Sequence, residues 1–297
     1  MNTIVILTHQ RPECLQLCLE SLTQARGIRH YRIYIATNED CHPDIVGVCH
    51  KVIGWLNPEI DIRPAGWLID QSNAEAFKAG ADRSDDYFIE VAEDEEVSRD
   101  CLETLEYAAK SFRTDKTFGI ASAFSVSPFR ARPDCDNLIA KHAGLTTQAT
   151  LIFNEPFNRL LRPLLTPEYY GNEYGVVGGL MTHKADFLAK HFAEFPQLGA
   201  GLDGIIEKLM ARHGMHSFTP LVPRAHQIGF YGTHMRTNEG VYNSVLTGDT
   251  EHKARQLRAY IDSGRIKGLF GDWAVEYHSI KPDHSWATLE LITDQTA

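Results

Sequence analysis

The stretch DDYFIEVAEDEEV, residues 85–97, joins an apolar strand pattern to a run of acids. Tyr, Phe, Ile and Val at its start predict a buried strand. The acids Glu93, Asp94, Glu95 and Glu96 follow that strand directly. Because Mg²⁺ and Mn²⁺ prefer oxygen ligands, adjacent carboxylates at a strand end predict a divalent-cation site. The alternative is a strand that ends in a solvated acidic loop.

The segments before this stretch alternate between strand and helix signals. Residues 3–8 form a continuous apolar run of strand length, and Pro12 then opens a helix that Gly27 closes. Residues 31–37 form a second strand pattern, and a short helix over 73–81 leads into the acidic stretch. Further along, the patterns predict helices after Ser98 and over 184–192, 204–213 and 250–263, and strands over 117–124, 176–182 and 217–222.

This alternation predicts an α/β fold with a mostly parallel central sheet flanked by helices. Ligands of such sheets bind at the carboxyl ends of the strands. Polar residues follow three of the predicted strands there, at 8–11, 38–40 and 93–95. We therefore expect a ligand site where these three segments meet.

The composition fits one large domain or two small ones and limits the partners. The chain has 297 residues, of which 43% are hydrophobic, and a net charge of −10. The acidic balance argues against a dominant nucleic-acid surface. A local basic groove stays open, since four arginines occur in the middle third of the chain: Arg130, Arg132, Arg159 and Arg162.

The cysteines and the amino-terminal sequence indicate the compartment. Six cysteines include no CxxC pair, so free thiols in a reducing compartment are expected. The start of the chain lacks a signal-peptide pattern, and no apolar run approaches the ~18 residues that span a bilayer. We expect a soluble, cytoplasmic protein with no membrane span.

Four segments, in their order along the chain, resemble the GT-A fold of nucleotide-sugar-dependent glycosyltransferases. The similarity is to the family 2 enzymes and the N-acetylglucosaminyltransferase I group. Residues 3–22 resemble the first strand and helix, and 73–97 the run into the metal motif. Residues 178–188 resemble the acceptor-side loop and helix, and 201–229 the catalytic helix and its exit.

This resemblance implies a domain division and a GT-A fold. Residues 1–235 would form the glycosyltransferase domain, with 1–124 as the nucleotide-sugar-binding half and 125–235 as the acceptor and catalytic half. Residues 236–297 would form a C-terminal helical extension. Within the second half, 125–175 show little periodicity and many Arg, Pro, Asn and Tyr residues, and we interpret them as a substrate-facing excursion.

The resemblance also implies the metal ligands. Glu95 is expected to bind a Mn²⁺ or Mg²⁺ ion directly, while Glu93 and Asp94 contact ribose, sugar or a metal-bound water. The family motif usually ends in Asp, whereas this chain has Glu-Asp-Glu, so the direct ligand stays open among the three. His226 is the second candidate ligand and His234 its rival. A structural histidine is the alternative for both.

Asp203 resembles the family's general base. An inverting transfer needs one carboxylate within hydrogen-bond reach of the acceptor hydroxyl. The alternative for Asp203 is an ordinary helix N-cap. Glu96 is expected to face solvent at the start of the next helix.

The end of the first strand is the expected nucleotide site. Thr8, His9 and Arg11 would contact base and diphosphate, and Glu39 or Asp40 would hold base or ribose. For Arg11, a surface charge on the first turn of the helix is an equally weighted alternative. Asn73 resembles the asparagine near the nucleotide in family 2. Gly179, with Gly178, would let the backbone approach the donor sugar, or form a plain bulge.

The chain is thus expected to be a metal-dependent glycosyltransferase that moves a sugar from a nucleoside-diphosphate sugar, most commonly a UDP-sugar in related families, to a hydroxyl. The acceptor stays open among a glycan, a small molecule and a modified nucleic-acid base, the last disfavoured by the acidic charge. Two alternatives remain: a sugar-phosphate nucleotidyltransferase, which the glycine-free THQRPE loop disfavours, and a catalytically degenerate fold that serves as a binding or scaffold protein.

Overall fold

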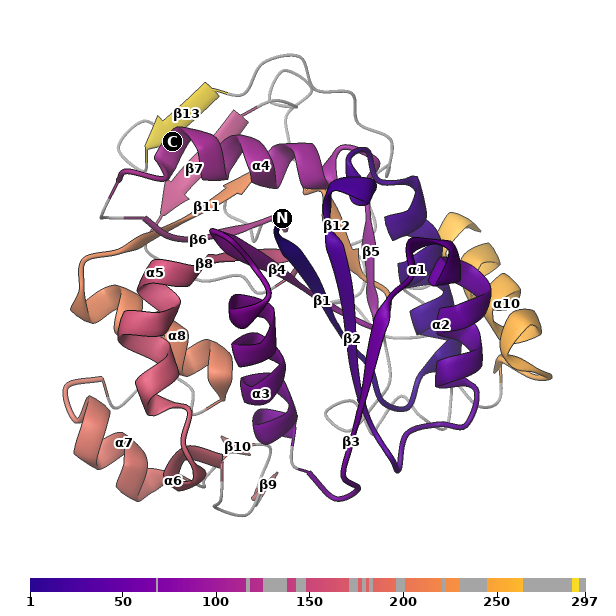
Figure 1. The fold of residues 1–297 in the computed structure, drawn as a ribbon, viewed down its shortest axis with the longest axis horizontal. Helices are drawn as coiled ribbons and strands as arrows, with labels where there is room; N and C mark the ends of the chain where they lie inside the picture. The colour runs from indigo at the N-terminus through magenta and orange to yellow at the C-terminus, as the bar shows by residue number, and fades with distance from the viewer. Residues whose placement is uncertain are drawn as a thin grey trace.

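A computed structural model shows the fold (Figure 1). It describes residues 1–67, 69–115, 118–124, 138–142, 148–170, 176–177, 180–181, 184–195, 201–220, 223–229, 245–263 and 290–293. Within these residues a nine-stranded sheet runs in the order β13-β7-β11-β6-β8-β4-β1-β2-β3. The predicted α/β class, with a mostly parallel sheet flanked by helices, is confirmed.

The first half of the sheet is entirely parallel. Strand β1 pairs with β2 on one side and with β4 on the other, and β2 pairs with β3. Parallel strands share one carboxyl edge, so the residues after β1, β2 and β4 come together, as the sequence predicts. The bounds are β1 Thr3–Leu7, β2 Arg32–Asn38, β3 Glu59–Arg63 and β4 Tyr87–Ala92.

The second half of the sheet is mixed. Strand β8 pairs antiparallel with both β4 and β6, while β6 and β11 are parallel. Strand β7 pairs antiparallel with β11 and parallel with β13. The bounds are β6 Phe118–Ser122, β7 Leu138–His142, β8 Thr150–Phe153, β11 His216–Pro220 and β13 Glu290–Thr293. The expected excursion over 125–175 therefore supplies two strands of the sheet, and its residues 125–137 lie outside the described part.

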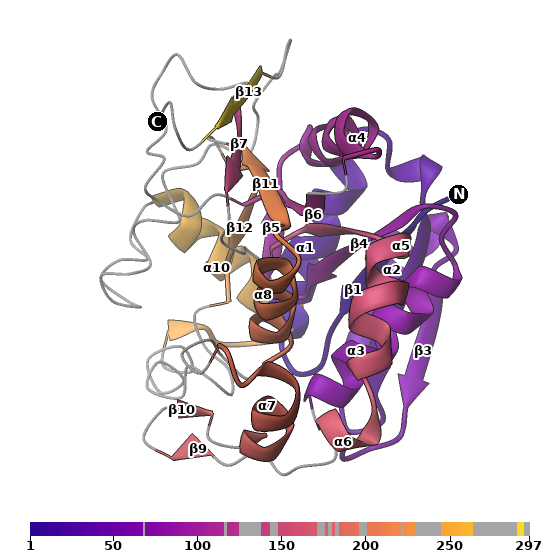
Figure 2. The ribbon, with the colours of Figure 1, turned by 90° about the vertical axis from the view of Figure 1, so that its left-hand side faces the viewer.

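Helices cover both faces of the sheet around two cores. One core joins Ile4 and Ile6 to α1, α2 and α4. The other joins Val5 and Phe88 to α3, η3, α7 and α8, and these elements gather on one side of the molecule (Figures 1 and 2). The bounds are α1 Pro12–Gln24, α2 Ile45–Ile53, α3 Ile69–Asp82, α4 Cys101–Phe112, α5 Asn154–Pro156, η3 Phe157–Leu161, α6 Pro167–Tyr170, α7 Ala185–Phe192 and α8 Leu202–Arg212.

Two elements of the first half were not predicted from the sequence. Helix α2 is rich in β-branched residues and contains Gly47, and both weaken helix propensity. Strand β3 alternates apolar and charged residues, a strand signal that the sequence does contain. Both elements fall between residues 41 and 72, for which the sequence analysis predicts no helix or strand.

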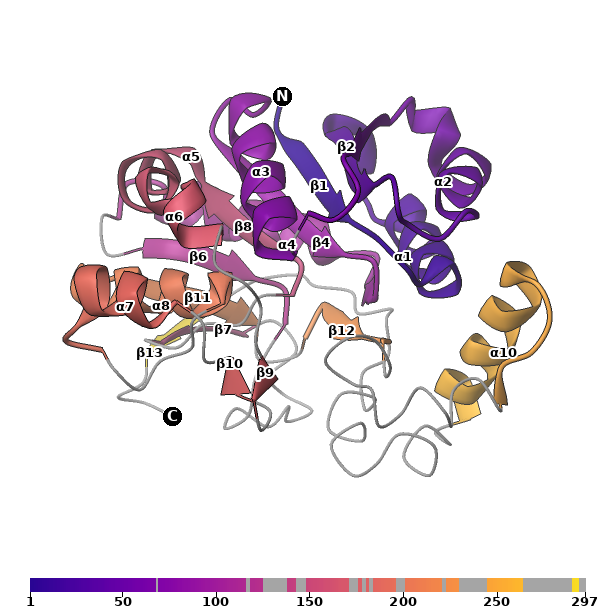
Figure 3. The same cartoon turned by 90° about the horizontal axis from the view of Figure 1, so that it is seen from below.

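A two-stranded ribbon lies beyond the carboxyl end of β4. Strand β5, Glu95–Val97, pairs antiparallel with β12, Ala225–Gln227. The C-terminal part contributes both a helix and a strand. Helix α10, Thr250–Ser263, lies beside α1 (Figure 3), and β13 extends the main sheet. The boundary at residue 235 stays a prediction.

Two further expectations concern cysteines and membranes. The described cysteines, Cys14, Cys18, Cys41, Cys49 and Cys101, are free, and Cys135 lies outside the described part. Among the described helices, none is long and apolar enough to cross a membrane.

Candidate active site

The site lies at the carboxyl ends of β1 and β4. Leu7 and Ala92 are register partners in these neighbouring strands, so both chains leave the sheet together. The Thr8 hydroxyl and the His9 backbone N–H both donate to Glu93 Oε2, each at 2.7 Å. Arg11 Nε donates to Glu93 Oε1 at 2.8 Å. The structure thus brings Thr8, His9, Arg11 and Glu93 together as expected.

These contacts give Glu93 a fixed position. The side chain is buried, and burial alone would raise its pKa. The Arg11 guanidinium and the hydrogen bonds from Arg11, Thr8 and His9 outweigh that effect, and the pKa of Glu93 is lowered. Because both carboxylate oxygens accept hydrogen bonds, Glu93 holds the loop after β1 in place as an ionised group.

Asp94 is held from both sides of the site. Its Oδ2 atom accepts hydrogen bonds from Arg11 Nη1 at 2.8 Å and from Gln227 Nε2 at 3.0 Å. Its backbone carbonyl accepts one from the Ile228 N–H at 2.7 Å. Arg11 therefore bridges Glu93 and Asp94, and it is neither a surface charge nor directed only at a diphosphate.

Gly229 packs directly against this pair. A Cβ atom at Gly229 would lie 2.1 Å from Asp94 Oδ2 and 2.4 Å from Arg11 Nη1. Both separations are far below van der Waals contact, so only glycine fits this backbone. The chain just after β12 thus packs directly against the carboxylates that follow β4, Glu93, Asp94 and Glu95, which form the acidic edge of the site.

Glu95 is buried, with 3% of its surface exposed. Its Oε2 atom accepts a hydrogen bond from the Ala149 backbone N–H at 2.8 Å. Burial raises the pKa of Glu95 well above its ordinary value, and the charges of Glu90 and Asp94 raise it further. Glu95 is therefore a carboxyl group whose negative charge is unfavourable unless a cation lies beside it.

Glu90 is a second buried acid that the sequence analysis missed. It lies within β4 and is 6% exposed. Burial raises its pKa well above the ordinary value, with further contributions from Asp203 and Asp94. The signal was available, since one charged residue interrupts an otherwise apolar strand, and such a residue is expensive to bury.

Asp203 reaches this group of acids from α8. It lies in the first turn of the helix and is exposed, and Gly201 is the N-cap residue. The N-cap alternative for Asp203 is therefore wrong. Its negative charge acts on Glu90, so α8 presents an accessible carboxylate to the buried acids at the end of β4.

Glu96 faces a different set of partners from Glu95. In the ribbon, His226 lies opposite Glu96, and its Nε2 atom is 3.0 Å from Glu96 Oε2. Arg258 Nη1 donates to the same carboxylate at 3.0 Å. Burial opposes ionisation, but His226 and Arg258 lower the pKa of Glu96 to about 2. The prediction that Glu96 faces solvent is wrong, because α10 covers it.

This register separates the two predicted metal ligands. Successive residues of a strand point to opposite faces, so Glu95 and Glu96 face away from each other. The structure places His226 with Glu96 and does not bring it together with Glu95. Its rival, His234, lies outside the described residues.

A second set of polar groups lies at the end of β2. His9 Nε2 is 3.4 Å from Asp40 Oδ1, and Gln10 Nε2 donates to the Asp40 carbonyl at 2.7 Å. Glu39 Oε2 accepts from the Ala65 N–H at 3.3 Å. The loops after β1, β2 and β3 are therefore linked to one another, and the expected Glu39 and Asp40 lie beside the acidic edge.

Of the two remaining residues expected at the nucleotide site, Asn73 lies in the described part of the chain and Gly179 does not. Asn73 is half-buried on α3, one residue after Ser72, whose hydroxyl donates to Asn38 Oδ1 at 3.2 Å. Gly179 lies outside the described residues, as does Gly178. The role of Asn73 and Gly179 stays a prediction.

Two of the four arginines in the middle third of the chain lie in the described part, and both form ion pairs. Arg159 pairs with Glu155 at 2.7 Å, and Arg162 pairs with Asp82 at 2.6 Å. Arg130 and Arg132 lie outside the described residues. The two described arginines are thus neutralised by carboxylates rather than lined up for a phosphate backbone.

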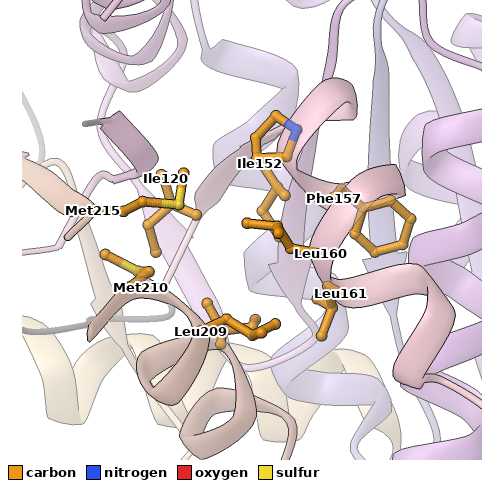
Figure 4. Close-up of a pocket in the computed structure, with 11 residues that line it drawn as sticks. Ile120, Ile152, Phe157, Leu160, Leu161, Leu209, Met210 and Met215 are labelled. Carbon is orange, nitrogen blue, oxygen red and sulfur yellow. The ribbon is translucent and has the colours of Figure 1, made fainter. Parts of the chain in front are cut away.

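A small apolar cavity lies away from these acids. Its volume is about 40 Å³, and it lies between η3, α8 and strands β6 and β8 (Figure 4). Its described lining is hydrophobic and includes Ile152, Phe157, Leu209 and Met215. Size and lining are both unsuited to a nucleotide, which needs charged and polar contacts.

The donor set at the acidic edge suits a hard cation, although the protein alone does not enclose one. Within the described residues, no three Asp, Glu, His or Cys side chains form a group that could hold a metal ion. Mg²⁺ is commonly bound by one or two carboxylates, with substrate phosphates supplying further ligands. The buried Glu95 and the adjacent Asp94 are carboxylates of that kind.

No protein-family model and no curated protein sequence matches the chain. Among solved structures, it is similar to S. aureus TarS, with a TM-score of 0.48 and 10% identity over 92% of this chain. TarS residues 1–349 in complex with UDP-GlcNAc give a TM-score of 0.49, with 11% identity over 88% of this chain and 72% of that one. Mannosyltransferase PcManGT from Pyrobaculum calidifontis, in complex with GDP-Man and Mn²⁺, gives 0.45, with 12% identity over 89% and 74%.

The chain spans 45% of the length of the first TarS structure. All three identities are well below 25% and all three TM-scores are below 0.5. These similarities therefore carry no argument about function.

Proposed function

We propose that the chain is a metal-dependent glycosyltransferase of the GT-A fold, which moves a sugar from a nucleoside-diphosphate sugar to an acceptor hydroxyl. One observation carries the proposal: Glu90, Asp94 and Glu95 are all buried at the carboxyl end of β4, where Arg11 and Gln227 hold Asp94 and the Ala149 N–H holds Glu95. Mutual repulsion among buried acids is costly, and a divalent cation would relieve it.

Glu95 is the proposed direct ligand of Mn²⁺ or Mg²⁺. Burial and the charges of Glu90 and Asp94 disfavour the negative charge of Glu95, and a cation beside the carboxylate would offset that cost. Asp94 lies beside it with Oδ2 fixed by Arg11 and Gln227. A bound cation would act as a Lewis acid that neutralises the charge developing on the leaving diphosphate.

The nucleoside is proposed to bind over the linked loops after β1, β2 and β3. His9, Glu39 and Asp40 lie there with exposed polar atoms that suit a base and ribose hydroxyls. Glu93 and Arg11 hold the loop after β1 in a fixed conformation before the donor arrives. Fixing the loop in advance lowers the entropy lost on binding. UDP-sugars are the proposed donors by the family resemblance.

Asp203 is the proposed general base. It is the exposed member of the acid group, so an acceptor hydroxyl can approach it from solvent. Its carboxylate would take the hydroxyl proton as the oxygen attacks the anomeric carbon, which inverts the configuration there. A positioned base contributes about 10²- to 10⁴-fold to the rate.

The test is hydrolysis of UDP-, GDP-, CDP- and dTDP-sugars with Mn²⁺ and without an acceptor. The rate is measured from the nucleoside diphosphate that is released. We expect the wild type to hydrolyse one donor class slowly, with water in place of the acceptor. Asp203→Asn should lower that rate by about 10²-fold or more while the nucleotide still binds. Glu207→Gln, on the same helix one turn later, is the matched control and should retain activity.

An Asp203→Asn variant as active as the wild type would contradict the proposed base. Wild-type protein that binds nucleotide and Mn²⁺ but turns over none of the donors would favour the scaffold alternative. Formation of nucleotide sugars from nucleoside triphosphates and sugar phosphates would instead favour the nucleotidyltransferase alternative.

A further inference from the structure

Arg258 of helix α10 reaches the acidic ribbon formed by β5 and β12. Arg258 donates from both Nη atoms to the two carboxylate oxygens of Glu96, a bidentate pair. Glu96 is 6% exposed at its side chain and Arg258 31%. The two residues are 162 positions apart in the chain. This ion pair thus links the C-terminal helix to the residue directly after Glu95.

Helix α10 is itself fixed against the body of the protein. Ala254 and Leu257 are buried against Cys14 and Leu17 of α1 and against Ile228, which follows β12. Figure 3 shows α10 alongside α1, at the margin of the molecule. The packing sets the position from which Arg258 reaches Glu96.

The ribbon held in this way carries the site. Glu95 is its first residue on β5, and Asp94 immediately precedes it. From the opposite strand, Gln227 donates to Asp94 Oδ2 and the N–H of Ile228 donates to the Asp94 carbonyl. A shift of β5 relative to β12 would therefore move both proposed ligand-bearing residues.

We propose that Arg258 is a positioning residue, and that docking of α10 through the Arg258–Glu96 pair fixes the cation-binding geometry of Asp94 and Glu95. This inference rests on the proposed function, since it assigns the C-terminal helix a part in the same site. The pair is unlike the ordinary surface pair Arg255–Glu251 on the same helix, whose side chains are 64% and 50% exposed. Exposed pairs contribute little, whereas Glu96 is a buried carboxylate whose charge, without Arg258, is compensated only in part by His226.

The experiment compares Arg258→Gln with the matched control Arg255→Gln by two measurements. The first is amide hydrogen exchange in peptides covering residues 93–98 and 224–229. The second is Mn²⁺ affinity in the presence of whichever of UDP, GDP, CDP and dTDP tightens Mn²⁺ binding to the wild type most. Arg258→Gln should speed exchange in both peptides and weaken Mn²⁺ binding up to about 10- to 100-fold, the loss that follows when a side chain bonded directly to a metal ligand is removed. Arg255→Gln should match the wild type in both.

Arg258→Lys separates positioning from simple loss of charge. Lysine keeps the charge but cannot form the planar bidentate contact, so Mn²⁺ affinity should fall between wild type and Arg258→Gln. Equal exchange in Arg258→Gln and Arg255→Gln would overturn the inference. So would faster exchange with unchanged Mn²⁺ affinity. If the wild type bound no Mn²⁺ with any nucleotide, that result would contradict the proposed function instead. Hydrogen exchange alone would then decide whether Arg258 holds the ribbon.

Discussion

At the residue scale, the site depends on acids with opposite ionisation behaviour. Glu93 is held ionised by Arg11 and by hydrogen bonds, while Glu95 and Glu90 are held toward the protonated form by burial and neighbouring charge. Acids whose surroundings push their pKa values apart are characteristic of functional sites. Glu93 thus organises the loop after β1, and Glu95 is the group whose charge state a cation would change.

Gly229 gives a residue-scale prediction about close packing. Gly229→Ala should force the Asp94–Arg11 pair or the end of β12 to shift, because the new Cβ would overlap both side chains. We expect the free energy of unfolding, measured with urea, to fall by about 1–3 kcal/mol. Gly47→Ala is the control, since nothing lies within 4 Å of its added Cβ. A Gly229→Ala protein as stable as the wild type would show that the backbone at Gly229 does not pack tightly against Asp94 and Arg11.

At the element scale, the β5–β12 ribbon explains what the sequence could and could not predict. The sequence predicts a functional role both for the acids at the end of β4 and for the segment around His226. Their register was not, and it decides that His226 faces Glu96 rather than Glu95. A strand slipped by one residue would reverse that outcome, and three-residue strands give no periodicity from which register can be deduced.

Burial of Glu96 in the ribbon predicts how the free energy of unfolding depends on pH. Its pKa in the folded protein is about 2, against an ordinary 4.5, so the folded state favours its ionised form. The stabilisation is present in full above about pH 4.5 and is lost as the pH falls toward 2. Glu96→Gln should therefore show a shallower loss of unfolding free energy across that window, measured by urea unfolding at each pH.

The matched control for this prediction is Glu155→Gln, which removes an exposed acid whose side chain is 72% exposed. That variant should follow the wild-type pH dependence. If Glu96→Gln also followed it, the Glu96 carboxylate would not be protected by His226 and Arg258 as the structure indicates.

At the scale of the whole molecule, two halves meet at the acidic edge. Parallel strands β1, β2 and β4 supply the loops on one side, and α8 brings Asp203 from the other. A buried ion pair between Asp70 of α3 and Lys184, just before α7, joins the halves. The Lys184 ammonium also lies 3.5 Å from the centre of the Tyr169 ring. Burial lowers the pKa of Lys184, and the charge of Asp70 and the hydrogen bond that it accepts from Lys184 oppose that shift.

The overall plan was accessible from sequence because its signals are local. Apolar runs at β1 and β4 and the helix signals around α1, α4, α8 and α10 each lie within a few residues, and their order predicts the parallel half of the sheet. Strand β8 runs antiparallel between β4 and β6, and nothing in its four residues indicates those partners. Arg258 was missed for the same reason, since its partner lies in a distant segment.

The proposed function requires a divalent cation and a nucleoside diphosphate to bind together through Glu95. The most direct measurement is an electron paramagnetic resonance titration of Mn²⁺ into the protein, with and without UDP, GDP, CDP or dTDP. We predict that one nucleotide tightens Mn²⁺ binding to the wild type and that Glu95→Gln abolishes this coupling. Equal Mn²⁺ binding with and without every nucleotide, or full coupling retained in Glu95→Gln, would contradict the claim.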